Sequence, residues 1–281
     1  MLRSSCLCGA VSWEVNGELQ FMSHCHCSRC CKTRGTAFAT EVAAAADGYT
    51  MHGGEHVAAF ASSPELSRRF CTRCGSAVPG QPWQGLVFVP AGNFETDPGV
   101  RPLSHIFVAS KAPWYDIPDQ LPQFDAYPPG IEATVLDDLP RPHSSAHPRG
   151  SCLCGGVTFE LTTPPVLAHN CHCSRCRRRS SGAHTSSVMT AIDGVRFLDG
   201  EDLLVTYKLP EAQFFAHTFC RVCGSKMPYL DSARGIAIVP LGAFDDDPGI
   251  RPRAHIYVGS KAPWFEIHDQ LPQFVEHYQR T

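Results

Sequence analysis

The hexapeptide Cys-His-Cys-Ser-Arg-Cys occurs twice in this 281-residue chain, at Cys25–Cys30 and again at Cys171–Cys176. Each copy places three thiols within six residues, enough to fill three corners of a tetrahedral zinc site. The neighbouring residues offer no common fourth ligand, because His24 before the first copy is replaced by Asn170 before the second. Three protein ligands with one open position are typical of a catalytic zinc site, which water or substrate completes.

Three alternatives to an open zinc site stay possible for these CHCSRC loops. The loops could feed a shared metal cluster, reach a distant residue that closes a second four-ligand site, or carry no metal. His26 and His172 stand between the cysteines, and we expect them to point away as packed or solvated side chains. The ligands of the predicted open sites are Cys25, Cys27, Cys30, Cys171, Cys173 and Cys176.

A second set of cysteines predicts one closed zinc site in each half of the chain. A C-x-C pair and a later C-x-x-C pair supply two short ligand pairs from separate segments, as in structural zinc sites. Gly75 and Gly224 follow the last cysteines, where a tight turn often needs a positive φ. Free buried or redox-active thiols are the alternative, which the ligand-like spacing in both copies disfavours. The predicted ligands are Cys6, Cys8, Cys71 and Cys74, and Cys152, Cys154, Cys220 and Cys223.

The chain contains the same domain sequence in two copies. The first five cysteines recur 146 positions later, the last two recur 149 positions later, and the segment 97–124 returns at 247–274. We therefore predict a first domain at 1–128, a Pro/Ser-rich linker at 129–147 and a second domain at 148–281. We expect the two domains to pack as a pseudo-dimer, since a duplicated homodimer interface is self-complementary.

The elements that position these cysteines are predicted to be short β-strands, which gives a mainly β fold class. Val11, Trp13 and Val15 alternate with polar residues and end at Asn16-Gly17, a dipeptide typical of a hairpin turn. The 23 Pro and 23 Gly disfavour long helices, although a short helix can follow each CHCSRC loop. Buried strands are predicted at Leu86–Phe94, His105–Val108, Ile236–Phe244 and His255–Val258.

Composition and charge narrow the possible functions. Hydrophobic residues make up 43% and charged residues 18% of the chain, as in globular proteins. The formal net charge is −3, and the basic run Arg175–Arg179 is too short to indicate nucleic-acid binding. We see no signal peptide and no apolar run of about 20 residues, so we expect a cytoplasmic protein without a membrane partner. In that setting clustered cysteines indicate metal ligands rather than disulfides.

Each copy carries three motifs in the same order: C-x-C, then C-H-C-x-x-C, then C-x-x-C-G, followed by HI(F/Y)V-x-SKAPW. This pattern resembles the glutathione-dependent formaldehyde-activating enzyme and centromere protein V family over nearly all of both copies. The resemblance implies two tandem Mss4-like zinc-binding domains of coiled antiparallel sheets. It also implies a structural zinc at the paired cysteines, a second zinc at each CHCSRC loop, and a carbon–sulfur lyase that joins glutathione to formaldehyde. The fusion of two domains departs from the common single-domain members.

As a hypothesis, the open zinc position would bind the thiolate of a small thiol such as glutathione, whose sulfur would then attack formaldehyde. Zinc with three thiolates carries one net negative charge, and a fourth thiolate doubles it, which is unfavourable in a dry pocket. Basic residues after the loops could offset this charge or stay solvated: Lys32, Arg34 and Arg177–Arg179. Trp114 and Trp264 could wall a ligand pocket, although such residues more often serve packing.

The leading functional hypothesis is a carbon–sulfur lyase acting on a thiol adduct such as S-hydroxymethylglutathione, with two structural zinc ions and up to two more at the loops. The alternative is a non-catalytic binding module stabilised by zinc. The closed sites alone would account for eight of the 15 cysteines. Structural zinc would also contribute about 10–16 kcal/mol to folding.

Overall fold

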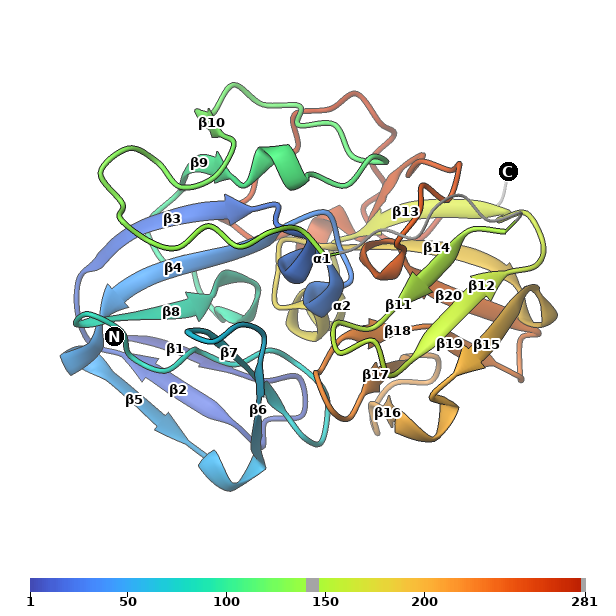
Figure 1. The fold of residues 1–281 in the computed structure, drawn as a ribbon, viewed down its shortest axis with the longest axis horizontal. Helices are drawn as coiled ribbons and strands as arrows, with labels where there is room; N and C mark the ends of the chain where they lie inside the picture. The colour runs from blue at the N-terminus through green and yellow to red at the C-terminus, as the bar shows by residue number, and fades with distance from the viewer. Residues whose placement is uncertain (140–146, 279–281) are drawn as a thin grey trace.

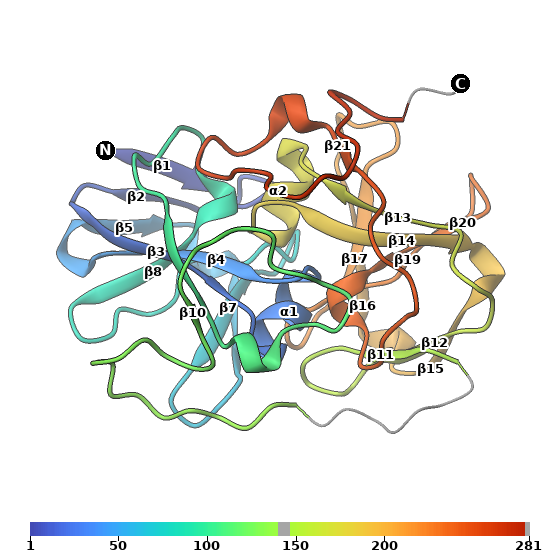
Figure 2. The same cartoon turned by 90° about the horizontal axis from the view of Figure 1, so that it is seen from above.

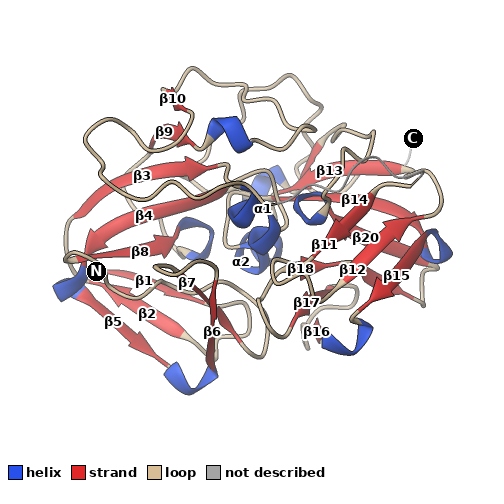
Figure 3. Cartoon of the chain, viewed as in Figure 1, coloured by secondary structure: helices blue, strands red, loops and turns tan. Residues whose placement is uncertain are grey.

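Two lobes lie side by side in the computed structural model, which describes residues 1–139 and 147–278 (Figure 1). The N-terminus lies on the first lobe. Short strands dominate both lobes (Figure 3), which confirms the predicted mainly β fold class. Within the described residues, we find no helix with the length and apolar character needed to cross a membrane.

Three sheets form the first half. A three-stranded sheet has the order β1-β2-β5, a five-stranded sheet has the order β10-β9-β3-β4-β8, and β6 pairs with β7. The pairs are antiparallel except that β9 runs parallel to β3 and to β10. The strands are β1 (Leu2–Ser5), β2 (Ser12–Val15), β3 (Leu19–Cys25), β4 (Ala39–Ala45), β5 (Tyr49–His52), β6 (Val57–Ala61), β7 (Ser67–Cys71), β8 (Leu86–Pro90), β9 (Pro102–Ile106) and β10 (Gln123–Phe124).

The second half repeats this arrangement, with the sheet orders β11-β12-β15, β19-β20-β14-β13-β21 and β16-β17-β18. A single bridge between Phe70 and Ala77 in the first half stands where β17 pairs with β18 in the second. The strands are β11 (Arg149–Ser151), β12 (Thr158–Leu161), β13 (Leu167–Cys171), β14 (Thr185–Ala191), β15 (Val195–Asp199), β16 (Leu204–Lys208), β17 (Ala216–Cys220), β18 (Lys226–Met227), β19 (Tyr229–Asp231), β20 (Ile236–Pro240) and β21 (His255–Ile256).

Each CHCSRC loop runs directly into a seven-residue helix, α1 (Ser28–Arg34) or α2 (Ser174–Ser180). The sulfur of Cys27 caps α1 by accepting the backbone N–H of Cys30, and Cys173 caps α2 in the same way. The predicted short helices are therefore confirmed. They begin inside the loops rather than after them, so the last cysteine of each loop lies in the first helical turn.

The hairpin predicted at Asn16-Gly17 is wrong. β2 and β3 flank this turn, but β2 pairs with β1 and β5, whereas β3 pairs with β4 and β9. The backbone N–H of Asn16 donates to the carbonyl oxygen of Gly48 at 2.8 Å. The turn therefore connects two sheets. β2, which holds Trp13, lies in the three-stranded sheet, and β3, which ends at Cys25, lies in the five-stranded sheet.

All four predicted buried strands are present but end earlier than predicted. β8 and β20 end at Pro90 and Pro240, and β9 and β21 end at Ile106 and Ile256. A short 3-10 helix follows each strand. Because its residues are largely apolar, the sequence pattern of the strand continues into it, and the predicted strands are therefore too long. The 3-10 helices are Ala46–Gly48, Gly54–His56, Ala91–Asn93, Val108–Ser110, Ile192–Gly194, Glu201–Leu203, Leu241–Ala243 and Val258–Ser260.

The two halves share one hydrophobic core. Trp13 and Phe38 of the first half, and Phe159 and Trp264 of the second, are at most 2% exposed and belong to one contiguous cluster. The indole N–H of Trp264 donates to the carbonyl oxygen of Ala91 in the other half at 3.1 Å. This tryptophan is therefore a packing residue of the junction, in agreement with the commoner role of large buried aromatics.

Equivalent elements of each half build the junction between them. α1 packs on the 3-10 helix 241–243, and α2 packs on the 3-10 helix 91–93; Figure 2 shows both helices at the junction. A Cβ atom on Gly92 would lie 2.3 Å from the backbone nitrogen of Gly182, and one on Gly242 would lie 2.4 Å from the carbonyl oxygen of Cys31. Glycine is required at both positions because the backbones approach too closely for a side chain.

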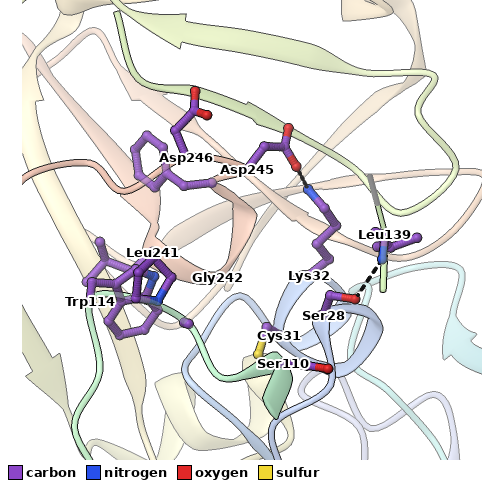
Figure 4. Close-up of a pocket in the computed structure, with 13 residues that line it drawn as sticks. Ser28, Cys31, Lys32, Ser110, Trp114, Leu139, Leu241, Gly242, Asp245 and Asp246 are labelled. Atoms are coloured by element: carbon purple, nitrogen blue, oxygen red, sulfur yellow. Dashed lines mark hydrogen bonds and ion pairs between the residues drawn. The ribbon is translucent and has the colours of Figure 1, made fainter. Parts of the chain in front are cut away.

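A buried ion pair crosses this junction. Lys32 pairs with Asp245, and their side chains are only 7% and 9% exposed (Figure 4). The Lys32 ammonium also donates to the carbonyl oxygen and hydroxyl of Ser151, at 2.8 and 3.0 Å. At the equivalent place in the other half, Arg178 pairs with Glu95 at 3.0 Å, with side chains 28% and 48% exposed.

We predict that Lys32→Met destabilises the chain far more than Arg178→Met does. Loss of Lys32 leaves the Asp245 carboxylate buried without its cation, which costs about 3–5 kcal/mol. The more exposed Arg178 pair contributes about 1 kcal/mol or less. Urea unfolding of the two variants measures the difference, and equal losses would contradict the asymmetry.

The predicted linker, 129–147, lies partly outside the described residues, which omit 140–146. Its described part up to Leu139 contains no helix or strand and contacts the first half. The Ser28 hydroxyl donates to the Asp138 carboxylate at 3.0 Å, and the Arg29 guanidinium donates to the carbonyl oxygen of Asp137 at 2.7 Å. This segment therefore lies against the start of α1.

Candidate metal centres

The structure brings together the cysteines of every predicted site. Four groups have their sulfur atoms within 4.8 Å of one another, two with four members and two with three. The four-cysteine groups are Cys6, Cys8, Cys71 and Cys74, and Cys152, Cys154, Cys220 and Cys223. The three-cysteine groups are Cys25, Cys27 and Cys30, and Cys171, Cys173 and Cys176.

The four-cysteine groups have the dimensions of a tetrahedral zinc site. In the first, the sulfur of Cys8 lies 3.5 Å from that of Cys6 and 3.7 Å from that of Cys71. The corresponding distances in the second are 3.3 and 3.8 Å. Zinc–sulfur bonds of about 2.3 Å in a tetrahedron place neighbouring sulfurs about 3.8 Å apart. The donor set and the spacing therefore fit zinc.

Local hydrogen bonds hold the first four-cysteine group in place. The backbone N–H of Val11 donates to the sulfur of Cys6 at 3.3 Å. The hydroxyl of Ser76 accepts the backbone N–H of Leu7 at 3.1 Å and lies 3.4 Å from the sulfur of Cys74. Ser76 thus ties the two cysteine-bearing segments together.

Close contact between the thiols shifts their pKa values. Hydrogen bonds to Cys6 and Cys71 lower the pKa of Cys74, and the same two neighbours lower the pKa of Cys8 to about 7. In the second group the pKa of Cys223 is lowered for the same reason. The same contacts raise the pKa values of Cys6, Cys71, Cys152 and Cys220. Since thiolates rather than thiols bind metals, a bound ion would have to displace the protons that these members keep.

Each three-cysteine group lies where a strand leads into a helix. In the first, β3 ends at Cys25, while Cys27 caps α1 and Cys30 lies in its first turn. Cys25 and Cys30 are buried and Cys27 is half-buried. In the second group the half-buried members are Cys173 and Cys176. Each group therefore has at least one member that is less buried than the others.

No fourth Cys, His, Asp or Glu completes either three-cysteine group among residues 1–139 and 147–278. The adjacent thiol of Cys31 is buried and donates to the carbonyl oxygen of Ala37 at 3.1 Å instead. Three thiolates fit three corners of a tetrahedral zinc site and leave the fourth to a ligand from outside the chain.

One thiol in each loop has a lowered pKa. Hydrogen bonds to Cys25 and Cys27 lower the pKa of Cys30, and the nearby Arg68 guanidinium adds to the effect. In the second loop, hydrogen bonds to the two neighbouring cysteines lower the pKa of Cys173 to about 3. The first thiolate therefore forms at different positions in the two loops.

Most basic residues expected to offset the loop charge have other partners. Lys32, Arg34 and Arg178 form ion pairs with carboxylates. Arg177 donates to two backbone carbonyl groups. Lys32 and Arg178 are thus paired with carboxylates of the other half. Arg34 adds to the lowering of the pKa of Cys30 by its neighbouring thiols, and cysteines of the second loop are among the charged neighbours of Arg177 and Arg179.

A chain of two histidines and one aspartate lies behind each loop. His26 Nε2 is 2.8 Å from His105 Nδ1, and His105 Nε2 is 3.0 Å from the Asp119 carboxylate. The second half repeats the chain with distances of 2.7 and 3.0 Å. Its members are His172, His255 and Asp269.

These chains fix the orientation of the histidines that stand between the cysteines. His26 and His172 are 0% exposed, as expected for packed side chains, and burial lowers the pKa of His26 to about 3. Their partners His105 and Asp119 were not predicted from the sequence. The available signal was that both recur 150 positions later, at His255 and Asp269.

A cavity of about 20 Å³ lies between the two histidine chains at the junction of the halves. Phe38 and His184 line it from equivalent positions, as do Tyr115 and Phe265. His184 is 2% exposed, and burial followed by the nearby His255 lowers its pKa to about 3.

We predict that His184 contributes to loss of stability in acid. Its pKa is about 3 in the folded chain and 6.5 in the unfolded one, so the stability it provides above pH 6.5 is lost as pH falls toward 3. Between pH 7.5 and 5 this loss is about 2 kcal/mol. His184→Phe, which copies Phe38, is expected to shrink the drop in unfolding free energy between these pH values. An unchanged drop would contradict the assignment.

Comparison with known proteins connects both halves to one family. The family model described as "Glutathione-dependent formaldehyde-activating enzyme" matches residues 1–110 and 147–260. A Halomonas elongata protein named "Putative glutathione-dependent formaldehyde-activating enzyme" is 33% identical over 128 residues, covering 42% of this chain and 81% of that protein. A crystal structure of a Rhodobacter sphaeroides protein is 27% identical, covers 37% of this chain and 92% of that chain, and has a TM-score of 0.29.

Proposed function

Because this chain belongs to the glutathione-dependent formaldehyde-activating enzyme family, we propose that its CHCSRC loops bind the thiol of glutathione and act on the carbon–sulfur bond of S-hydroxymethylglutathione. The observation that carries the proposal is the pair of three-cysteine groups that no fourth ligand completes in the described residues. A thiol from outside the chain would supply the same donor atom as the three cysteines.

Zinc at all four cysteine groups is part of the proposal. The four-cysteine groups would hold closed, structural ions, and the three-cysteine groups would hold ions with one exchangeable position. When bound at a loop, zinc supplies a Lewis acid that lowers the pKa of a coordinated thiol. The domain limits 1–128 and 148–281, the linker 129–147 and the pseudo-dimer belong to the same proposal.

The residues of the chain position the loop and leave one side of it accessible. Cys27 caps α1 and is the half-buried member of its group, so the incoming thiol approaches from its side. His26, which is hydrogen-bonded to His105, fixes the loop on its buried side. In the forward reaction the thiol sulfur bonds to the carbon of formaldehyde, the C=O π electrons move to oxygen, and the thiol proton ends on that oxygen. The reverse reaction breaks the same carbon–sulfur bond.

Calorimetric titration of the zinc-loaded chain with glutathione and with S-methylglutathione tests the proposal. Glutathione is expected to bind at least tenfold more tightly, because the methylated sulfur cannot become a thiolate. Equal affinities would contradict binding through the thiol.

Catalysis needs a second measurement, the exchange rate between ¹³C-formaldehyde and S-hydroxymethylglutathione by NMR. The proposal predicts that the loaded chain accelerates this exchange in proportion to its concentration. Thiol-dependent binding without acceleration would contradict the lyase and favour the non-catalytic zinc-stabilised module.

A further inference from the structure

A buried arginine lies at each three-cysteine group, but the two halves supply it from different positions. In the first half Arg68 comes from β7, and its Nη1 atom donates to the sulfur of Cys30 at 3.5 Å. Its Nε atom is buried without a hydrogen-bond partner. Although burial works to lower the pKa of this guanidinium, the three loop cysteines raise it, Cys30 most strongly.

The second half has no arginine at the position equivalent to Arg68, but has one at another position near its loop. The residue equivalent to Arg68 on β17 is His217, which is 0% exposed. Burial lowers the pKa of His217 well below its usual value, so this side chain is neutral. Arg179 on α2 lies one helical turn after Cys176, is 5% exposed, and stands where the first half has Thr33. Arg179 also has a buried Nε atom without a hydrogen-bond partner, and the loop cysteines are its charged neighbours.

The other charged residues near the two groups have partners of their own, and the Lys226 ammonium donates to the carbonyl oxygens of Gly75 and Gly224. In the first half Arg34 is paired with Glu41, so this pair adds no net charge. In the second half serines occupy both equivalent positions, Ser180 and Ser187. In the described part of the second half, Arg177 also lacks a carboxylate partner and interacts with Cys173, but its guanidinium donates to the carbonyl oxygens of Ser260 and Gly92. Within the described residues, Arg68 and Arg179 are the buried guanidiniums at the two groups with neither a carboxylate nor a carbonyl partner.

We propose that Arg68 and Arg179 are equivalent positioning residues, each balancing the negative charge that three thiolates and a zinc ion carry at its loop. This inference rests on the proposed function, since it assumes that the loops hold zinc. Zinc with three thiolates carries one net negative charge, which the guanidinium cancels. An entering thiolate then brings the buried group to one net negative charge instead of two, so the arginine favours both the metal and its fourth ligand.

The test measures zinc affinity at the first loop by chelator competition, in a full-length chain whose second loop carries Cys173→Ser and Cys176→Ser. Arg68→Gln is expected to weaken zinc binding at the first loop by about 10–100-fold, which is the usual effect of removing a residue that hydrogen-bonds to a metal ligand. Arg68→Lys, which keeps the charge, is expected to recover most of the loss. Arg69→Gln is the matched control, because Arg69 lies on the same strand and, among residues 1–139 and 147–278, its guanidinium donates only to the carbonyl oxygens of Pro79 and Gly80.

A second test transfers the arginine arrangement of the second half into the first half. Arg68→His combined with Thr33→Arg reproduces in the first half the pair found at His217 and Arg179, and is expected to restore zinc affinity lost in Arg68→His alone. Arg179→Gln, measured with the first loop disabled by Cys27→Ser and Cys30→Ser, is expected to weaken the second loop to a similar extent. This reciprocal variant keeps the proposal testable should the exchanged chain fail to fold.

Affinity within twofold of wild type in Arg68→Gln and Arg179→Gln would overturn the inference. Equal losses in Arg68→Gln and Arg68→Lys, without recovery in the exchanged chain, would also overturn it, because packing rather than charge would then explain them. A wild-type loop that takes up no zinc contradicts the proposed function instead, and zinc in the four-cysteine groups serves as the internal control for folding.

Discussion

Cys74→Ser is expected to unfold the first half of the chain at room temperature. Cys74 is 0% exposed and belongs to the first four-cysteine group. A structural zinc contributes about 10–16 kcal/mol to folding, which equals or exceeds the net stability of about 5–15 kcal/mol of a typical domain. Limited proteolysis with mass spectrometry is expected to show rapid cleavage within residues 1–128 of the variant.

Arg73→Ser is the matched control, because Arg73 is an exposed residue of the same C-x-x-C segment. It is expected to leave the protease resistance and the zinc content unchanged. Cys223→Ser, the equivalent change in the second half, is expected to unfold that half. A Cys74→Ser chain that keeps its protease resistance would show that the four-cysteine group does not stabilise the fold.

Replacement of Cys30 and Cys176 by serine is expected to abolish glutathione binding with little effect on stability. Each change removes one thiol from a three-cysteine group and leaves both four-cysteine groups intact. Outside the closed sites the loss of one buried sulfur costs about 1 kcal/mol, as for an average substitution. Calorimetric titration is expected to show an affinity at least 100-fold weaker, with the thermal unfolding midpoint within a few degrees of wild type.

Cys31→Ser is the control for this prediction. Cys31 follows Cys30 on the same helix and belongs to no cysteine group, and a serine hydroxyl can replace its hydrogen bond to the carbonyl oxygen of Ala37. Glutathione binding is expected to persist in this variant. Equal losses in both variants would mean that helix packing, rather than sulfur ligation, governs binding.

The cysteine groups could be predicted from the sequence because short spacing limits where their sulfur atoms can lie. Cys25 and Cys30 are only five positions apart, and the duplicated motif identified every member of the four groups. The mainly β fold followed from the alternation around Trp13 and the many Gly and Pro residues.

Features that depend on sheet order and on the junction could not be predicted. The Asn16-Gly17 dipeptide is typical of a hairpin, but the sheet order β1-β2-β5 makes it a crossing between layers. Lys32 looked like a free cation beside the loop, because its partner Asp245 is supplied by the other half. Arg68 gave no repeat signal, since His217 replaces it and Arg179 takes over from another element.

Zinc content tests the central claim most directly, measured by elemental mass spectrometry on protein purified without chelators or reducing thiols. We predict about four zinc ions per wild-type chain and about two in the Cys30→Ser and Cys176→Ser double variant. About two ions in both proteins would contradict it, because the CHCSRC loops would then hold no zinc at all.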